Sequence, residues 1–446
     1  MPKKKYLSLL LLFLFFLSSC ASYSKLLPRK TTKNLHKRLT ASPIFTQGFT
    51  GFQLYDPKTK AVLYEQFANK YFTPASNTKI FTFYTASKVL GDTIPALKYL
   101  ITGDSLIFWG TGDPSLLHPH LPQNQSVIKF LNNREEQLFY CPDNFIDNRY
   151  GSGWMWDDYP YSFQIEKAGL PIYGNFIRVQ GEENSLNFQI TPSFFADKVI
   201  SDSTLGGKTA RLYRQEKSNT IEYNQKKVGK NAIERALPFI YTDSLAIQLL
   251  QDSVSKPIKI IREFGKTQKQ HNIVYSIPRD SILKKMMVDS DNFLAEQLIL
   301  LCANELSDTL NTAKGIQLAK TTFFKNSPDE LLWYDGSGLT RYNQFTPRSI
   351  VAVLEKVYQE IPSKQWPTFF KDGNSFGKPN EENQVFQPFV FAKSGSMRNV
   401  RCLSGFLFTS SGKTLIFSFM NNHIPGSSRP WTEEMETVLT FLHKEL

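Results

Sequence analysis

Three short polar motifs, far apart in the chain, constrain the fold more than any other feature of the sequence. They are Ser76-x-x-Lys79, Ser290-Asp291-Asn292 and Lys393-Ser394-Gly395. The first is weak alone, because serine-x-x-lysine begins at seven serines: Ser22, Ser76, Ser126, Ser253, Ser281, Ser375 and Ser410. Taken as one site, the motifs require residues from both ends of the chain to meet. The sequence therefore predicts one domain built from both ends, with the middle of the chain inserted.

The first motif lies at the start of an expected helix. Residues 48–65 alternate and contain the turn Asp56-Pro57-Lys58, which predicts a β-hairpin. Apolar residues then recur at near-helical spacing before the stop signal Gly91, namely Ile80, Phe83, Ala86 and Leu90. Ser76 follows Pro74 and is thus expected near a helix N-terminus.

The other two motifs also border regular elements. Ser290-Asp291-Asn292 forms a polar break before an apolar helix expected over residues 293–306. Residues 388–397 are expected to form a strand that carries Lys393. Residues 403–408 and 415–420 flank a turn at 410–413, which predicts a hairpin, and a closing amphipathic helix includes residues 435–442.

The fold class that these patterns predict is α/β (α+β). We expect residues 41–96 and 266–446 to form the helix–sheet domain. Residues 97–265 are mixed and strand-like, with many turn residues, and are expected to form inserted, mostly β domains, with a further insertion at about 180–235.

The first motif predicts an activated nucleophile. A serine hydroxyl is a poor nucleophile at neutral pH and needs a base. Residues three apart on a helix face the same side, so Lys79 can reach the Ser76 hydroxyl. A lysine acts as a base only when it is neutral, and burial lowers its pKa by disfavouring the charged form.

The other motifs supply groups that handle the substrate. Ser290 can relay a proton to the leaving group, and Asn292 can hydrogen-bond a substrate amide. Lys393 offers a cation for a substrate carboxylate. A strand carrying Lys393, Ser394, Gly395 and Ser396 can pair with an extended peptide, and backbone N–H groups of Ser76 and Ser396 would form an oxyanion hole. Read singly, the same motifs are a helix cap, a loop and a solvated lysine.

The ordered trio is typical of penicillin-binding proteins and class A β-lactamases. The chain resembles the D-Ala-D-Ala carboxypeptidase/endopeptidase family typified by penicillin-binding protein 4, the low-molecular-mass class C penicillin-binding proteins. The likeness extends from about residue 45 to the end and is thin from about 180 to 235. It rests on the trio and on further segments at 72–79, 112–116, 154–158, 335–341 and 392–397.

This resemblance implies a penicilloyl-serine transferase (β-lactamase-like) fold with inserted domains, acting on peptidoglycan stem peptides through an acyl-enzyme at Ser76. β-Lactam antibiotics are the expected covalent inhibitors. The third motif has Ser394 where the family usually has threonine, which keeps the hydroxyl. The alternatives are a β-lactamase or esterase on the same fold, or a catalytically idle wall-binding protein, and the preference between exo- and endopeptidase action stays open.

The N-terminus predicts export and a lipid anchor. Three lysines precede an apolar run over residues 6–17, which is too short to span a bilayer and typical of a signal peptide. It ends in Leu17-Ser18-Ser19-Cys20, which is similar to a bacterial lipobox. We expect residues 1–19 to be removed, Cys20 to be lipidated and residues 20–40 to form a tether in the periplasm. The alternative is an ordinary secretory peptide cut near Ala21.

Composition excludes several function classes. The formal net charge of +12 falls to +9 without residues 1–19, which contain three lysines and no acidic residue. Nucleic acid is not an expected partner, because the chain has no arginine-rich run or nucleic-acid module and the expected compartment holds none. With no CxxC or HExxH-like pattern we expect no metal and no cofactor. The remaining cysteines, Cys141, Cys302 and Cys402, form either one disulfide or three buried thiols.

Overall fold

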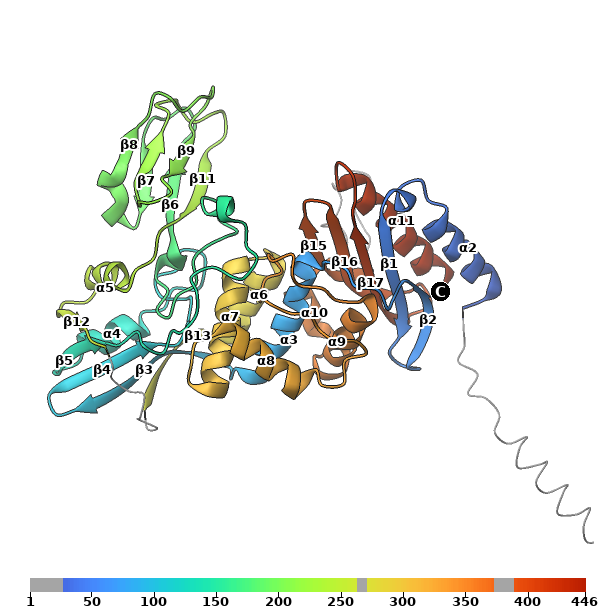
Figure 1. The fold of residues 1–446 in the computed structure, drawn as a ribbon, viewed down its shortest axis with the longest axis horizontal. Coiled ribbons are helices and arrows are strands. Elements are labelled where there is room, and N and C mark those ends of the chain that lie inside the picture. The colour runs from blue at the N-terminus through green and yellow to red at the C-terminus, as the bar shows by residue number, and fades with distance from the viewer. Residues whose placement is uncertain (1–26, 263–270, 373–388) are drawn as a thin grey trace, which may run out of the picture.

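The computed structural model describes residues 27–262, 271–372 and 389–446. Its C-terminal half and its first strands meet in one six-stranded sheet, drawn in red and blue in Figure 1. The strands lie side by side in the order β14 (Lys371–Asp372), β15 (Val390–Met397), β16 (Val400–Phe408), β17 (Thr414–Asn422), β1 (Phe49–Asp56) and β2 (Ala61–Gln66). The antiparallel pair β1 and β17 joins the two ends of the chain.

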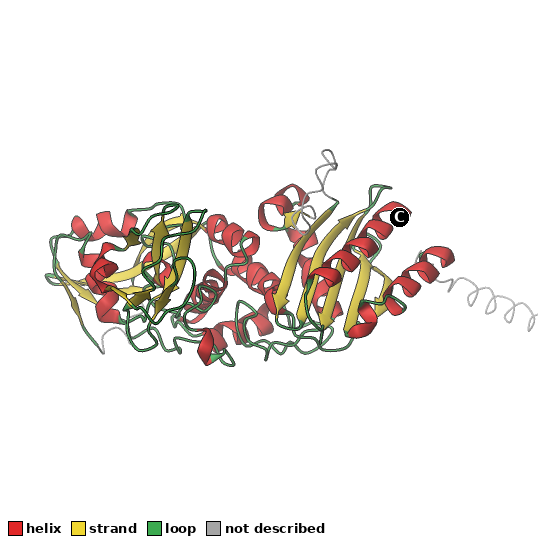
Figure 2. Ribbon diagram, turned by 90° about the horizontal axis from the view of Figure 1, so that it is seen from above, coloured by secondary structure: helices red, strands yellow, loops and turns green. Residues whose placement is uncertain are grey.

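Helices cover both faces of this sheet, as Figure 2 shows. Alternate residues of β17 point to opposite faces, the expected result of a two-residue strand period. Ile416 and Met420 pack with helix α9 (Pro347–Glu360) in one core. Phe417 and Phe419 pack in another with the helices α2 (Arg29–Thr40) and α11 (Arg429–Glu445). A sheet buried on both faces explains the nearly continuous apolar runs of its central strands.

A layer of helices lies between this sheet and the inserted region (Figure 1). At its centre α3 packs against α6, α7 and α9. Its members are α3 (Lys79–Val89), α6 (Arg279–Val288), α7 (Asn292–Ser307), α8 (Thr312–Phe323), α9 and the short α10 (Trp366–Phe369).

The inserted region has its own core and three small sheets. The largest contains β12 (Ile258–Ile260), β5 (Gln137–Tyr140), β4 (Ser105–Gly110), β3 (Thr93–Thr102) and β13 (Asn272–Pro278). Two three-stranded sheets consist of β11 (Ile233–Pro238), β6 (Phe176–Gly181) and β7 (Phe188–Thr191), and of β8 (Val199–Ser201), β10 (Ile221–Tyr223) and β9 (Leu212–Arg214). The helices α4 (Ser126–Asn132) and α5 (Asp243–Gln251) complete it.

The expected elements around the three motifs are present, and the mixed α and β class is confirmed. Both edges of the inserted region differ slightly from the expectation, because β3 begins at residue 93 and β13, which pairs with it, ends at residue 278. Cys141, Cys302 and Cys402 are buried thiols, the second of the two alternatives.

The expectation of a tether over residues 20–40 is wrong for residues 29–40. They form α2, whose Leu35 and Leu39 are buried against the sheet. The helix was missed because its outward face carries Lys30, Lys33 and Lys37, which make the segment basic and polar on average. The signal peptide 1–19, the lipobox and Cys20 lie outside the described residues.

Candidate active site

Ser76 lies in a single helical turn, Ala75–Thr78, that leads directly into α3. Two other segments press closely on this turn. A Cβ added to Gly395 of β15 would lie 2.5 Å from the Pro74 carbonyl oxygen, and one added to Gly338 would lie 1.9 Å from the Ala75 carbonyl oxygen. Glycine at both positions therefore lets the backbone of the strand and of the loop approach the turn that carries Ser76.

Lys79 occupies a position with no exposed side-chain surface and three hydrogen-bond acceptors. Its Nζ donates to Ser76 Oγ at 3.1 Å, to Asn292 Oδ1 at 2.6 Å and to the Ser337 carbonyl oxygen at 2.8 Å. Burial lowers the pKa of Lys79 to about 8, although the carboxylates of Asp335, Asp291 and Glu296 oppose this shift. All three acceptors are neutral, so a deprotonated amine can keep two of them and turn its lone pair toward Ser76.

The second motif contributes a serine held by strained backbone. Ser290 has a φ of 60°, which lies in the left-handed region that a non-glycine residue rarely adopts. Its hydroxyl accepts a hydrogen bond of 2.9 Å from Lys393 Nζ. Lys393 is itself buried, and burial followed by the charge of Lys79 holds its pKa well below the ordinary value.

Asn292 begins α7 and is fixed at both ends of its amide. Asp291 caps the helix by accepting the Leu294 N–H at 2.9 Å. The Asn292 amide accepts from Lys79 through Oδ1 and donates from Nδ2 to the Phe163 carbonyl oxygen at 2.9 Å. The inserted region, which supplies Phe163, thus helps to orient Asn292, the residue that accepts from Lys79.

The third motif lines the site as part of β15. Residues Lys393 to Met397 pair with β16 on one side, whereas β14 pairs only with Phe391 and Ala392 on the other. Among the described residues, the second edge of Ser394, Gly395 and Ser396 therefore carries no strand. Asn77 links β15 to the turn that carries Ser76, because its Nδ2 donates to the Lys393 carbonyl oxygen at 2.7 Å.

The structure thus brings together the residues of all three motifs that the sequence analysis singled out. A model of the D-Ala-D-Ala carboxypeptidase 3 (S13) family matches residues 31–442. The chain belongs to this family. As a member of the S13 family it is a serine-type D-Ala-D-Ala carboxypeptidase, and the prediction from the sequence is confirmed at that level.

Curated relatives and a solved structure are similar along most of this S13 chain. D-alanyl-D-alanine carboxypeptidase DacB of Haemophilus influenzae is 25% identical over 82% of this chain and 83% of that protein. The D-alanyl-D-alanine carboxypeptidase of Actinomadura sp. (strain R39) is 23% identical over 85% of this chain and 79% of that protein. The crystal structure of penicillin binding protein 4 (dacB) from Haemophilus influenzae has a TM-score of 0.71, 21% identity, and covers 93% of this chain and 99% of that chain. This likeness confirms the penicilloyl-serine transferase fold.

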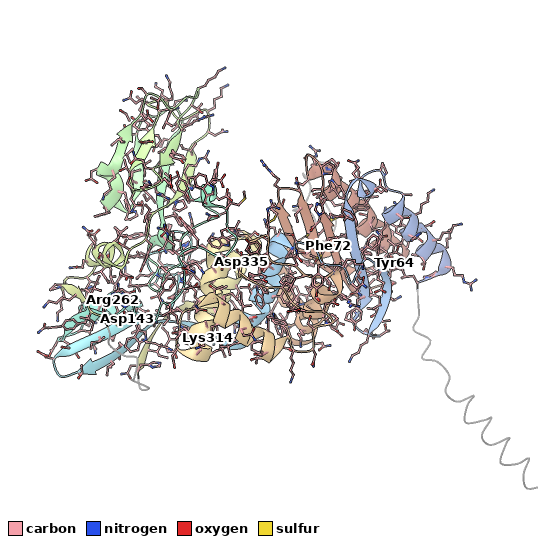
Figure 3. The ribbon with its side chains drawn as sticks, viewed as in Figure 1. Tyr64, Phe72, Asp143, Arg262, Lys314 and Asp335 are labelled. Atoms are coloured by element: carbon pink, nitrogen blue, oxygen red, sulfur yellow. The ribbon has the colours of Figure 1, made fainter. Side chains whose placement is uncertain are left out.

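Sequence reasoning gave no role to two buried carboxylates, Asp335 and Glu296, that lie near Lys79. Asp335, at the centre of the molecule in Figure 3, accepts hydrogen bonds from Trp154 Nε1 and from the N–H groups of Gly338 and Thr340. Glu296 lies on α7, four residues after Asn292, and only it and Gln297 interrupt the apolar run from Phe293 to Ala303. An acidic residue among the apolar residues of this helix was the available signal, since a carboxylate is rarely buried without partners.

Proposed function

We propose that Ser76 is the nucleophile of this carboxypeptidase and that Lys79 is its general base. Neutral Lys79 removes the proton of Ser76 Oγ as that oxygen attacks the carbonyl carbon between two D-alanines of a peptidoglycan stem peptide. The new Oγ–C bond gives a tetrahedral intermediate, whose oxyanion the backbone N–H groups of Ser76 and Ser396 would stabilise. Collapse breaks the C–N bond and leaves an acyl-enzyme.

Departure of D-alanine needs a proton on its nitrogen. The Ser290 hydroxyl, which accepts from Lys393 Nζ at 2.9 Å, is placed to deliver that proton and to recover one from Lys393 or Lys79. The unpaired edge of Ser394 to Ser396 would bind the peptide as an added strand, with Asn292 donating to a substrate amide and Lys393 facing its terminal carboxylate. Water then hydrolyses the acyl-enzyme and releases the shortened peptide.

One observation carries this assignment, namely the contact of Lys79 with Ser76 at a buried position where the hydrogen-bond acceptors of Lys79 are all neutral. The two atoms lie 3.1 Å apart, within reach for proton transfer, and the pKa of Lys79 is lowered to about 8. The other two acceptors of Lys79 Nζ, Asn292 Oδ1 and the Ser337 carbonyl oxygen, carry no negative charge, so the neutral amine is accessible near physiological pH.

Covalent labelling with fluorescent penicillin tests the assignment. The parent enzyme should form a penicilloyl adduct on the peptide that contains residues 72–79, and Ser76→Ala should abolish it. Ser87→Ala is a matched control that should leave labelling unchanged. Within the described part of the chain, the Ser87 hydroxyl bonds only to the Tyr84 carbonyl oxygen of its own helix. Labelling that persists in Ser76→Ala or maps to another serine would contradict the assignment.

We further propose that the enzyme acts in the bacterial periplasm, held to a membrane by lipid on Cys20. The lipobox at residues 17–20 supports this proposal. No helix within the described ranges has an apolar stretch that could cross a bilayer. Several acyl chains on one residue anchor a protein stably, whereas one chain binds only marginally. Cys20→Ala should move the protein out of the membrane fraction or leave it unprocessed; normal processing with unchanged partitioning would count against lipidation.

A further inference from the structure

The loop at residues 336–337 is clamped between two helices behind the nucleophile. Its two N–H groups face α7, where Gly336 donates to Glu296 Oε2 at 3.1 Å and Ser337 donates to Glu296 Oε1 at 2.8 Å. Its two carbonyl oxygens face α3, where the Gly336 oxygen accepts from Thr82 Oγ1 at 2.6 Å and the Ser337 oxygen accepts from Lys79 Nζ at 2.8 Å. The hydrogen bonds from the loop to Glu296 therefore help to orient the Ser337 carbonyl oxygen, which accepts from Lys79.

A glutamate at position 296 can accept hydrogen bonds from both N–H groups, whereas a glutamine cannot. The Glu296 carboxylate is 1% exposed and has two oxygens, one for each N–H group. A glutamine offers a single acceptor oxygen, and its NH₂ would face an N–H group. The loop also packs tightly on α7, because a Cβ added to Gly336 would lie 2.6 Å from the Ala295 carbonyl oxygen.

We propose that Glu296 is a positioning residue for acylation, which fixes the Ser337 carbonyl and thereby aims the Lys79 amine at Ser76 Oγ. A neutral amine has two hydrogens and one lone pair. Asn292 Oδ1 and the Ser337 oxygen take the two hydrogens, and the lone pair is left for the Ser76 proton. If the Ser337 oxygen turns away, the amine is free to rotate and the near-attack geometry is lost. The inference rests on Lys79 as the base, as proposed above.

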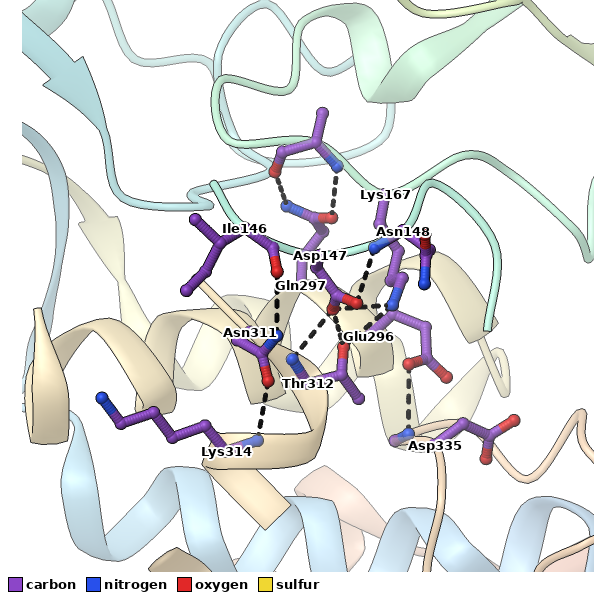
Figure 4. Close-up of polar contacts among 12 residues, drawn as sticks. Ile146, Asp147, Asn148, Lys167, Glu296, Gln297, Asn311, Thr312, Lys314 and Asp335 are labelled. Carbon is purple, nitrogen blue, oxygen red and sulfur yellow. Dashed lines mark hydrogen bonds and ion pairs between the residues drawn. The ribbon is translucent and has the colours of Figure 1, made fainter. Parts of the chain in front are cut away.

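The inserted region brings a buried lysine close to Glu296. Lys167, 2% exposed, approaches α7 from that region and pairs with Asp147 Oδ2 at 2.8 Å, and Figure 4 shows this pair beside Glu296. Burial and the nearby Asp335 raise the pKa of Glu296 to about 7, while Lys167 opposes the shift. The two N–H groups that donate to Glu296 favour the ionised form of its carboxylate.

The test measures the second-order rate of acylation by penicillin as a function of pH, in the full-length enzyme. Glu296→Gln should reduce the plateau rate by up to about 10²-fold, the scale expected for a misplaced catalytic group. It should also move the acidic limb of the profile to lower pH. Removing a negative charge lowers the pKa of Lys79, which otherwise faces the carboxylates of Asp335, Asp291 and Glu296. The buried Lys393 also titrates near Lys79, and its own pKa is held well below the ordinary value.

Gln297→Met is the matched control for lost stability. Gln297 is the next residue of α7 and equally buried, but it bonds to Gly112 and Ala168 of the inserted region rather than to the 336–337 loop. The Gln297→Met variant should lower the melting temperature. It should neither move the acidic limb of the pH profile nor reduce the plateau acylation rate of the folded protein. Equal plateau losses in Glu296→Gln and Gln297→Met, or an unmoved limb in Glu296→Gln, would assign Glu296 a purely structural role.

A second variant keeps the test decisive if Glu296→Gln does not fold. Glu296→Asp retains the charge but is too short to bond both N–H groups, so it should reduce the plateau while the limb stays in place. A folded Glu296→Asp enzyme that acylates at the parent rate would overturn the proposal. Failure of the underlying base assignment looks different, because Lys79→Arg would then acylate at nearly the parent rate.

Discussion

The catalytic domain and the inserted region each bury a lysine, and the two lysines have different partners. Lys79 of α3 faces a hydroxyl, an amide oxygen and a backbone carbonyl, all neutral. Lys167 of the inserted region instead pairs with Asp147 at 2.8 Å and with the Thr312 hydroxyl at 2.9 Å. A carboxylate in contact stabilises a buried ammonium, whereas neutral acceptors leave the desolvation penalty uncompensated.

Burial alone therefore does not make a lysine a base. Lys167 and Asp147 together join the inserted region to α8, because Lys167 donates to the Thr312 hydroxyl and Asp147 accepts the Thr312 N–H at 2.8 Å. The nearby cation lowers the pKa of Asp147 despite its burial. Lys79, with acceptors that carry no charge, has a pKa lowered to about 8 and can exchange its proton during a reaction.

Replacing the base should have the largest effect. Lys79→Arg keeps the positive charge and much of the stem, but arginine cannot lose its proton in a protein. Acylation by penicillin should fall by at least the ~10²–10⁴-fold typical of a lost general base. Stopped-flow acylation of a variant shown by circular dichroism to fold measures this. A rate within a few-fold of the parent would remove Lys79 as the base and leave a relay through Ser290 as the candidate.

Replacing the structural lysine should instead cost stability. Lys167→Met leaves the Asp147 carboxylate buried without its cation, which typically costs about 3–5 kcal/mol of unfolding free energy. Denaturant unfolding measures this loss, and acylation by the folded fraction should stay within a few-fold of the parent. The double variant Lys167→Met with Asp147→Asn should recover part of the loss. A stable Lys167→Met enzyme that has lost acylation would reverse the roles inferred for the two lysines.

A smaller effect is expected from removing the hydroxyl partner of Lys393, another buried lysine. Ser290→Ala removes the hydroxyl that accepts from Lys393 Nζ. Penicillin acylation should fall less than cleavage of a D-Ala-D-Ala peptide, because the leaving amide of penicillin stays attached while D-alanine must depart with a proton. The ratio of the two losses measured on one preparation is the readout. Equal losses with both substrates would argue against a role for Ser290 in leaving-group protonation.

The candidate nucleophile, the candidate base and the three motifs could be singled out from the sequence because each lies beside a strong local signal. Ser76 precedes a periodic helix, Ser290 precedes an apolar run, and Lys393 lies in a strand. Their convergence, however, was an inference from resemblance and motif order. The packing that creates it depends on long-range contacts such as the pairing of β1 with β17, which no local pattern specifies.

The remaining features could not be predicted for physical reasons. The acceptor that Ser337 offers to Lys79 is a backbone carbonyl, which every residue has, so the sequence does not mark it. Glu296 interrupts an apolar helix, but its two partners are backbone N–H groups more than thirty residues away. Helix α2 was missed because only one narrow side of it, around Leu35 and Leu39, is buried.

The pH dependence of acylation tests the central claim, that Lys79 is a neutral base in a buried site. The pKa of Lys79 is lowered, so the active, deprotonated form accumulates as pH rises. The penicillin acylation rate of the parent enzyme should therefore increase through an inflection near pH 8 and then reach a plateau. An acylation rate that keeps rising to an inflection near the ordinary lysine pKa of about 10.4 would contradict the account. So would a rate that shows no inflection between about pH 6 and pH 10.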